Sequence, residues 1–297
     1  MRFQSGRLSV FCLFIAVTAP VRPALAQTAY EGFELTFPDY DGGNGLTGNW
    51  QQGGFNAFAA NYGAAETSLS FNGLQTSGGR IVGAAFPTIN GAIRNLAQPI
   101  GTDNTTLYLS LLVRPLGTLN QGVFNGFFGM TLGGSANELF VGKPGGGLVE
   151  SYVVEQRGGS GQISSGVPTV VGQTTLLVVR AEFLLGNDLF TLHVNPNPGY
   201  PEPTNGVMKS DLDLGMLSRL GIYSTGAFAI DEIRIGATYA DVTPKVPFAG
   251  TPGNSNCKGK SVSVLAQQYR GLTDAASALG YVNVAALQDA ITSFCAT

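Results

Sequence analysis

The chain has 297 residues, of which only 12 % are charged, and its formal net charge is −3 at pH 7. The charged fraction is about half of the ~25 % that soluble proteins average, and no Lys/Arg cluster interleaves with aromatic residues. This composition argues against nucleic-acid binding, which uses a basic surface. Glycine accounts for 42 residues, about double its usual share, which indicates many turns.

The N-terminus has the three parts of a secretion signal in the right order. Arg2 and Arg7 supply a positive start, residues 8–19 form a short apolar run, and Ala24-Leu25-Ala26 is a small-x-small cleavage site. The apolar run is shorter than the about 20 residues that a bilayer-spanning helix needs. We therefore expect residues 1–26 to be a signal peptide and the mature protein to be secreted, extracellular or periplasmic, with no membrane span. The alternative is a buried N-terminal helix.

Between residues 30 and 241, short β patterns alternate with turns of Gly, Asn and Pro. The clearest pattern is residues 107–114, where every second residue is Leu or Val and the set shares one face. We predict strands at residues 107–114, 123–132, 148–157, 175–184, 189–195, 217–223 and 228–235, and weaker ones at 33–36, 55–58, 68–71 and 80–86. Many short strands, with no helices between them and no internal repeat, predict a large antiparallel sandwich.

The last predicted strand changes its register. Phe228 and Ile230 share one parity, whereas Ile233 and Ile235 have the other. Either the strand is buried on both faces, or a β-bulge at Asp231-Glu232 switches the faces. We favour the bulge, because two adjacent carboxylates fit poorly into a strand that is buried on both faces.

The composition changes after residue 243. Residues 244–256 are rich in Pro, Gly and Asn and predict a linker. The spacing of apolar residues then predicts three short helices, at residues 261–269, 272–279 and 284–294. Gly271 and Gly280 have the positions of C-terminal caps, and Asn283 has that of an N-cap.

Cys257 and Cys295 are the cysteines that remain once the signal peptide is removed. In an oxidising compartment such a pair most simply forms a disulfide, which here joins the two ends of the helical segment and staples a small core. A redox or metal pair is the alternative, but the spacing is not CxxC and histidine partners are missing. We therefore divide the chain into a signal peptide (1–26), a β-sandwich (27–243), a linker (244–256) and a small helical unit (257–297).

Both ends of the predicted sandwich resemble a known kind of exported protein. The matching segments are Glu31-Gly-Phe33, Gly42-Gly-Asn-Gly-Leu-Thr-Gly-Asn-Trp50, Asp231-Glu-Ile-Arg-Ile-Gly236 and Ala240-Asp-Val-Thr-Pro244. They resemble bacterial exported proteins with a concanavalin A-like (laminin G-like) domain, over about residues 27–244. The resemblance implies an all-β, antiparallel two-sheet jelly roll, followed here by the disulfide-stapled helical unit. It does not select one function, because the fold hosts lectins, adhesion modules, glycan hydrolases and lyases.

Calcium is often bound by members of that family, and one loop of this chain has suitable oxygen ligands. Asp39, Asp41 and Asn44 lie close together in a Gly-rich stretch. The stretch departs from the EF-hand pattern, because Asn44 occupies the glycine position and Trp50 stands where a bidentate Glu belongs. A lectin-style calcium site and a plain Gly-rich turn are the two interpretations.

Catalytic carboxylates are not evident in the sequence. A retaining glycosidase needs two carboxyl groups about 5 Å apart in one cleft. Glu150 and Glu155 are five residues apart, so a regular strand sends them to opposite faces. Asp231 and Glu232 are adjacent, and a solvated or turn position is the simplest interpretation of both.

Six residues are candidates for ligand binding. Sugar sites combine an aromatic platform with planar polar groups, and the lone histidine lies on the polar face of its predicted strand, close to Arg180 and Glu182 if residues 175–184 and 189–195 pair. The candidates are Trp50, Tyr108, Tyr152, Arg180, Glu182 and His193. Each has a structural alternative: a core or rim aromatic residue, a same-face ion pair, or a histidine satisfied by its neighbours.

Three hypotheses follow. The first is a non-catalytic exported module that binds a glycan or a cell-surface component. The second is a glycan-active hydrolase or lyase, which a groove with paired carboxylates would favour. The third is a structural or adhesive surface protein without a small ligand, which a filled sheet face would favour.

Overall fold

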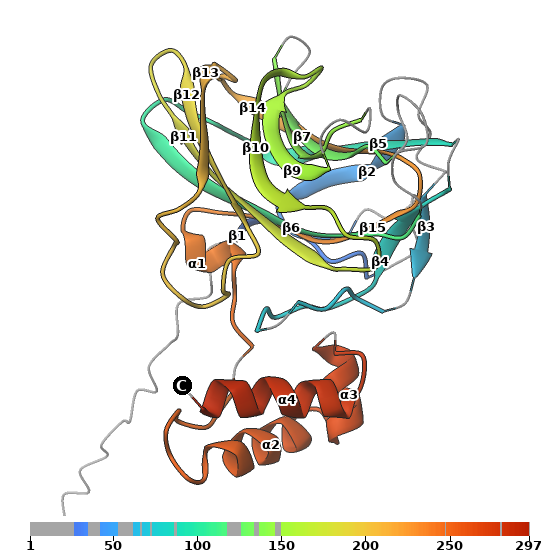
Figure 1. Ribbon diagram of the computed structural model, residues 1–297, viewed down its shortest axis with the longest axis vertical. Helices are drawn as coiled ribbons and strands as arrows, with labels where there is room; N and C mark the ends of the chain where they lie inside the picture. Colours follow the sequence, from blue (N-terminus) through green and yellow to red (C-terminus); the bar gives the residue numbers. More distant parts are fainter. Residues whose placement is uncertain are drawn as a thin grey trace, which may run out of the picture.

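The computed structural model describes residues 27–34, 42–52, 62–65, 67–71, 73–85, 88–117, 126–133, 137–145, 150–246, 248–279 and 281–296. In this part of the chain, two antiparallel sheets pack face to face, and three helices follow at the C-terminal end (Figure 1). The predicted signal peptide and the weak strand at 55–58 lie outside the described residues. No helix among the described residues is long and apolar enough to cross a membrane.

Within the described residues, the first sheet, sheet A, contains eight strands, and β1 pairs with the second half of β15. Its order is β13 (Val207–Leu212), β12 (Asp188–Val194), β11 (Thr175–Phe183), β6 (Thr105–Pro115), β15 (Phe228–Gly236), β4 (Arg80–Gly83) and β3 (Tyr62–Ala65), with β1 (Gln27–Glu31) beside β15. The second sheet, sheet B, has the order β10 (Ser160–Pro168), β9 (Ser151–Gln156), β8 (Glu138–Lys143), β7 (Phe128–Gly133), β14 (Leu217–Thr225), β5 (Ile89–Ile100) and β2 (Leu46–Gln52).

The connections between the sheets give a jelly roll. The chain passes from sheet B to sheet A between β5 and β6, and again between β14 and β15. Because β5 pairs with β14 and β6 pairs with β15, both antiparallel, the two crossings wind together as one double ribbon. The predicted fold class is therefore confirmed.

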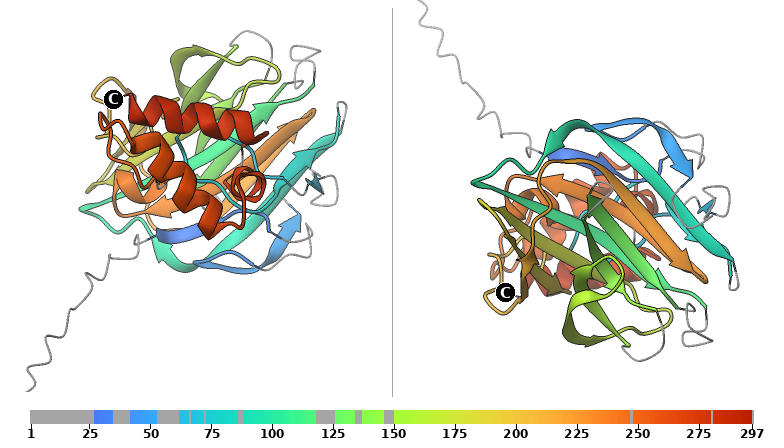
Figure 2. Two further views of the ribbon diagram at one scale, coloured as in Figure 1. Left: turned by 90° about the horizontal axis from the view of Figure 1, so that it is seen from below. Right: turned by 90° about the horizontal axis from the view of Figure 1, so that it is seen from above.

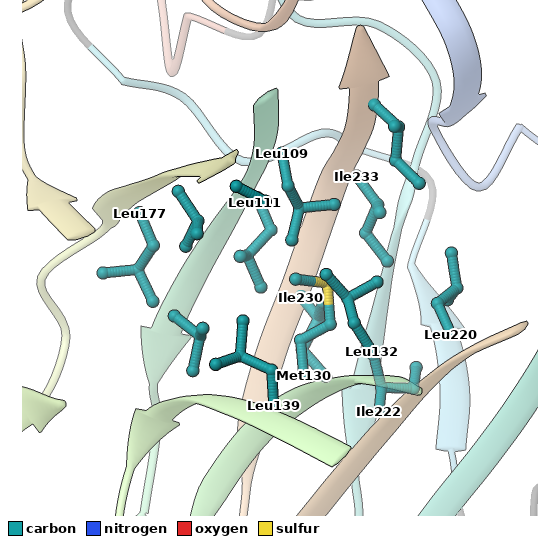
Figure 3. Close-up of a cluster of buried hydrophobic side chains, with 14 of the residues drawn as sticks. Leu109, Leu111, Met130, Leu132, Leu139, Leu177, Leu220, Ile222, Ile230 and Ile233 are labelled. Atoms are coloured by element: carbon teal, nitrogen blue, oxygen red, sulfur yellow. The ribbon is translucent and has the colours of Figure 1, made fainter. Parts of the chain in front are cut away.

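The main core lies between the sheets and follows from strand alternation. Figure 3 shows Leu109, Leu111 and Ile230 of sheet A pointing toward Met130, Leu132 and Ile222 of sheet B. A second apolar cluster covers the outer face of sheet A, where Leu112, Leu176 and Val178 pack under the short helix α1 (Tyr239–Val242). Residues 107–114 were expected to have one apolar face, but Leu112 belongs to this second core.

The β-bulge in β15 is confirmed, although the argument for it was wrong. The register shifts between Asp231 and Arg234, and Glu232 has a positive φ of 54°. Both carboxylates are nevertheless 0 % exposed, because the described residues of the segment 67–79, which are 67–71 and 73–79, cover this face of the strand and provide hydrogen-bond donors. Asp231 accepts from the hydroxyl of Ser68 at 2.5 Å and from the backbone of Leu69 at 2.7 Å.

The C-terminal helices lie against the outer side of sheet A (Figures 1 and 2). They are α2 (Cys257–Gln268), α3 (Leu272–Ala278) and α4 (Val284–Cys295). The predicted disulfide between Cys257 and Cys295 is present, with the Cα atoms 5.7 Å apart. Asn283 caps α4 by accepting from the backbone of Ala286, as predicted.

One predicted cap is wrong and one is not described. Gly271 is the N-cap of α3, with a φ of 147°, and does not end α2, whose C-cap is Tyr269. The chain turns at Arg270, which has a positive φ. Gly280 lies outside the described residues.

The stretch predicted as a linker begins in contact with the sandwich. The carbonyl of Pro244 accepts from the backbone of Gln75 at 2.8 Å, and the backbone of Val246 donates to the carbonyl of Gly73 at 3.0 Å. Val246 then joins the core of the helical unit. A further bond, from the Thr76 hydroxyl to the carbonyl of Leu279 at 3.1 Å, ties α3 to the segment that covers β15.

Candidate functional site

Four of the six candidate binding residues lie on one patch, the outer face of sheet A. Strand β6 carries Tyr108, β11 carries Arg180 and Glu182, and β12 carries His193. The predicted pairing of the last two strands is present, with Arg180 opposite Tyr108 on one side and His193 opposite Val178 on the other.

A fifth residue, Glu202, joins these side chains and was not selected from the sequence. Its carboxylate accepts a hydrogen bond from the Tyr108 hydroxyl at 2.8 Å and lies 3.0 Å from the Nε2 atom of His193. The Arg180 guanidinium is 3.4 Å from the same carboxylate and 2.8 Å from that of Glu182. The five residues form one polar network, which we call the Glu202 cluster.

The loop from residue 195 to 206 positions Glu202. Four prolines stiffen it, at positions 196, 198, 201 and 203. The backbone of Gly199 donates to the carbonyl of Thr243 at 3.0 Å, which fastens the loop beside α1. Such a loop has no strand or helix periodicity. The one signal in the sequence was that Glu202 follows His193, at the end of a predicted strand, by nine residues.

The charges of the cluster stabilise one another. Burial, followed by the hydrogen bond to Glu202, raises the pKa of Tyr108 to about 12, so its phenol stays a neutral donor. Burial opposes the charge of Arg180, but the carboxylates of Glu202 and Glu182 outweigh it and raise the pKa of Arg180. Arg180 therefore bridges two carboxylates as a permanent cation.

His193 is poorly placed for acid–base chemistry. Its side chain is 3 % exposed, and Nε2 is engaged by Glu202. The other nitrogen, Nδ1, is buried and has no hydrogen-bond partner among the described residues. Gly206 lies against it so closely that a Cβ atom there would be 2.8 Å from Nδ1. A general base needs a free nitrogen that reaches the substrate, so we assign His193 the role of holding the loop on the sheet.

A pocket opens beside this cluster. It has a volume of about 310 Å³ and lies between β10 and the end of β12. Ser165, Asn197 and Asn205 supply polar groups, and Val167 and Pro203 supply apolar walls. The amides of Asn197 and Asn205 are exposed and make no hydrogen bond within the described part of the chain. We call this the asparagine pocket.

Trp50 and Tyr152 do not offer the platforms expected of them. Trp50 is 3 % exposed, and its indole donates to the buried carboxylate of Glu31 at 3.1 Å. Tyr152 is 0 % exposed and faces the main core. Both rings are in the interior because their strand positions face the other sheet, which residue type alone does not reveal.

Of the three predicted calcium ligands, the structure describes Asn44. Asp39 and Asp41 lie outside the described residues. Asn44 pairs through its backbone with Tyr30, at 2.8 and 2.9 Å, and is exposed. Among the described residues, no three His, Cys, Asp or Glu side chains come close enough together to hold a metal ion.

The outer face of sheet B is filled by side chains. Phe140 and Val153 are 0 % exposed, and Tyr223 is 5 % exposed. The Phe140 ring occupies the space above Gly129, where a Cβ atom would lie 1.8 Å from it. The guanidinium of Arg157 lies 4.5 Å above the ring of Tyr223.

Comparisons with known proteins return solved structures only. No family model matches the chain, and no curated protein matches it. The carbohydrate recognition domain of Emp46p in a metal-free form is 10 % identical, with 60 % of this chain and 88 % of that one covered and a TM-score of 0.36. The endo-1,3-beta-glucanase of Streptomyces sioyaensis is 11 % identical, with 73 % and 98 % covered and a TM-score of 0.38.

The exoplasmic/lumenal domain of VIP36, in a form with Ca²⁺ and mannose bound, is 10 % identical, with 60 % and 84 % covered and a TM-score of 0.38. Likeness of this degree does not identify a ligand or a site. The class of the protein follows from its own topology: a two-sheet jelly roll with a disulfide-stapled helical unit. The laminin G-like part of the resemblance stays a prediction.

Proposed function

We propose that the protein is an exported, non-catalytic module that binds a glycan in the asparagine pocket. The observation that carries the proposal is the pair of amides, Asn197 and Asn205, that line this pocket and make no hydrogen bond among the described residues. An amide both donates and accepts hydrogen bonds, as sugar hydroxyls do. The apolar walls from Val167 and Pro203 suit the C–H face of a sugar ring.

The neighbouring charges favour a neutral ligand. The carboxylate of Glu202 is already engaged by Tyr108, His193 and Arg180. A charged ligand would have to compete with these partners, whereas a neutral glycan uses only the amides of Asn197 and Asn205 and the hydroxyl of Ser165, which accepts from the backbone of Val167 and can still donate. Secretion and a calcium ion held by Asp39, Asp41 and Asn44 belong to the same proposal.

A hydrolase at the adjacent carboxylates receives no support. Asp231 and Glu232 are both 0 % exposed behind the segment 67–79, so a substrate cannot reach them. A structural or adhesive role is the second candidate, because the filled outer face of sheet B leaves Phe140 and Tyr223 buried where an open groove would expose them.

A glycan array, run with calcium and with EDTA, tests the proposal. We expect at least one neutral glycan to bind, and the double variant Asn197→Ala/Asn205→Ala to bind about tenfold more weakly, because two hydrogen bonds are lost. The matched control is Asn187→Ala, which changes an exposed asparagine at the opposite end of the β11–β12 hairpin and should bind normally.

Two results would contradict the proposal. If no glycan binds under either condition, the structural role gains weight. If binding persists in the double variant, the glycan site lies elsewhere. Binding that is present with calcium and lost with EDTA would support the calcium site.

A further inference from the structure

We propose that a second pocket, between sheet A and the helical unit, binds a small hydroxylated anion of the size of an acidic monosaccharide. The pocket has a volume of about 570 Å³. One wall comes from β4, β6 and the segment before β4, and the other from α3 and the start of α4. Figure 1 shows the helical unit facing the sheet at this place. We call it the junction pocket.

Two arginines lie on the sandwich side of the junction pocket. Arg114 on β6 pairs with Ala229 of β15, and Ala229 pairs on its other side with Val82 of β4. Arg80 is two residues before Val82 and so has the same face. The small side chain of Ala229 between them leaves space, and both arginines line the pocket.

Neither arginine is neutralised by a described carboxylate. The guanidinium of Arg114 makes no hydrogen bond or ion pair with any residue the structure describes, and its Nε atom is buried without a partner there. The guanidinium of Arg80 donates only to the carbonyl and hydroxyl of Thr67 within the same part of the chain. A buried, unpartnered guanidinium nitrogen is costly, and a bound anion would satisfy it.

A described carboxylate behind the sandwich wall of the pocket, Asp231, is already engaged by other donors. Asp231 lies behind Ser68 and Leu69 and accepts hydrogen bonds from both. Burial raises the pKa of Asp231 well above its usual value, and the neighbouring Glu232 raises it further. Burial therefore disfavours the charged form of Asp231, which limits how far this carboxylate offsets the two arginines.

The helical wall adds neutral donors. The hydroxyl of Tyr281 is buried and has no partner in the part of the chain that the structure describes. Burial raises the pKa of Tyr281 to about 12, so it keeps its proton. Thr273 and Ser277 of α3 provide hydroxyls, and α4 begins at the pocket with Val284. The partial positive charge of a helix N-terminus acts in the same direction as the arginines.

The ligand class follows from charge and size. Arginine forks match the oxygens of carboxylate, sulfate and phosphate groups. The volume is far larger than one such group needs and lies in the range of small-molecule sites, about 300–1,000 Å³. The hydroxyls of Thr273 and Ser277 suit the remaining hydroxyls of a sugar. The junction pocket shares no residue with the asparagine pocket and does not depend on the proposed function.

Isothermal titration calorimetry of the purified protein tests the inference, with glucuronate, glucose 6-sulfate, glucose and inorganic sulfate at constant ionic strength. We expect one of the two acidic sugars to bind at a single site about tenfold more tightly than glucose and inorganic sulfate. Arg114→Gln and Arg80→Gln should each weaken this binding about tenfold, because a charge-assisted hydrogen bond is lost. The matched control is Arg219→Gln on β14, outside both pockets.

Thermal unfolding without ligand shows whether each variant is folded. Two arginine variants are used, so that the inference can still be tested if one of them fails to fold. The double variant Asn197→Ala/Asn205→Ala should still bind the acidic sugar, which separates this site from the proposed glycan site. No binding of either acidic sugar up to about 10 mM, or equal binding by both folded arginine variants, would overturn the inference. Inorganic sulfate binding as tightly as the acidic sugars would overturn the sugar part of it.

Discussion

Glu202 is the residue on which the polar network of sheet A depends. Replacing it by alanine would leave Tyr108, His193 and Arg180 without their shared acceptor. Leaving buried donors unsatisfied destabilises a protein by about 1–3 kcal/mol, so we expect Glu202→Ala to lower the free energy of unfolding by that amount, measured in urea.

Glu182→Ala is the comparison. Its side chain is 31 % exposed and makes one ion pair, with Arg180, and such pairs contribute about 0–1 kcal/mol. Equal losses in the two variants would show that Glu202 has no special role in holding the loop.

Asp231 gives the protein a pH dependence whose sign is fixed by its burial. Its folded-state pKa is raised well above the ordinary 3.8, first by burial and then by Glu232. The folded state therefore holds a proton that the unfolded chain releases. The stability that this proton contributes to the folded state is fully present below about pH 4 and is lost as pH rises through the folded-state pKa.

We expect Asp231→Asn to make the free energy of unfolding fall less steeply than in the native protein between about pH 4 and pH 7. Urea titrations at several pH values measure the two slopes. Identical slopes would mean that Asp231 is ionised in the folded state. Glu34→Gln, an exposed carboxylate near β1, is the control and should leave the slope unchanged.

At the scale of elements, the glycines of the helical unit separate into free and constrained positions. Gly259 lies in α2 with open space where a Cβ atom would be placed. Alanine is favoured over glycine in a helix by about 0.5–1 kcal/mol, so Gly259→Ala should raise the melting temperature of the helices.

Gly250→Ala is the opposite case. A Cβ atom there would lie 2.2 Å from the carbonyl of Cys257, so we expect this variant to lower the same melting temperature. Circular dichroism in the far ultraviolet follows both. A loss of stability in Gly259→Ala would contradict the assignment of that position as open.

The sequence predicted best the strands whose apolar residues recur at every second position. The predicted bounds of β6, β11 and β12 agree with the structure within two residues, although Leu112, Leu176 and Val178 on the other face are buried as well. Strand β10 was missed because most of it is exposed, and β5 because a buried Arg94, paired with Glu31, interrupts its apolar face. The predicted strand at 68–71 is instead the segment that covers Asp231, without strand pairing.

The candidate site could be predicted only in part, for the same reason. Strand parity placed His193 beside Arg180, and the structure has that arrangement. It could not place Glu202, which reaches the cluster from an irregular loop, nor show that Trp50 and Tyr152 face the core. The junction pocket was also beyond the sequence, because its two walls are about 160 or more residues apart along the chain and come together only in the fold.

At the scale of the molecule, the disulfide controls the helical unit and hence the junction pocket. The helical core is small and includes Ala275, Ala276, Leu279, Leu287 and Ile291. A disulfide that closes a loop of 38 residues contributes about 2–4 kcal/mol, which is a large share of the stability of so small a core. We therefore expect reduction of Cys257–Cys295 to unfold the helices at a temperature at which the sandwich stays folded.

Circular dichroism with and without reductant measures the helical signal, and the fluorescence of Trp50, the one tryptophan of the chain, follows the sandwich. Titrations under the same reducing conditions then distinguish the two pockets. Acidic sugar should no longer bind, because α3 and α4 form one wall of the junction pocket. Glycan binding in the asparagine pocket should persist, because β10, β12 and the loop 195–206 are in the sandwich. Loss of both together would mean that the sandwich depends on the helical unit for its stability.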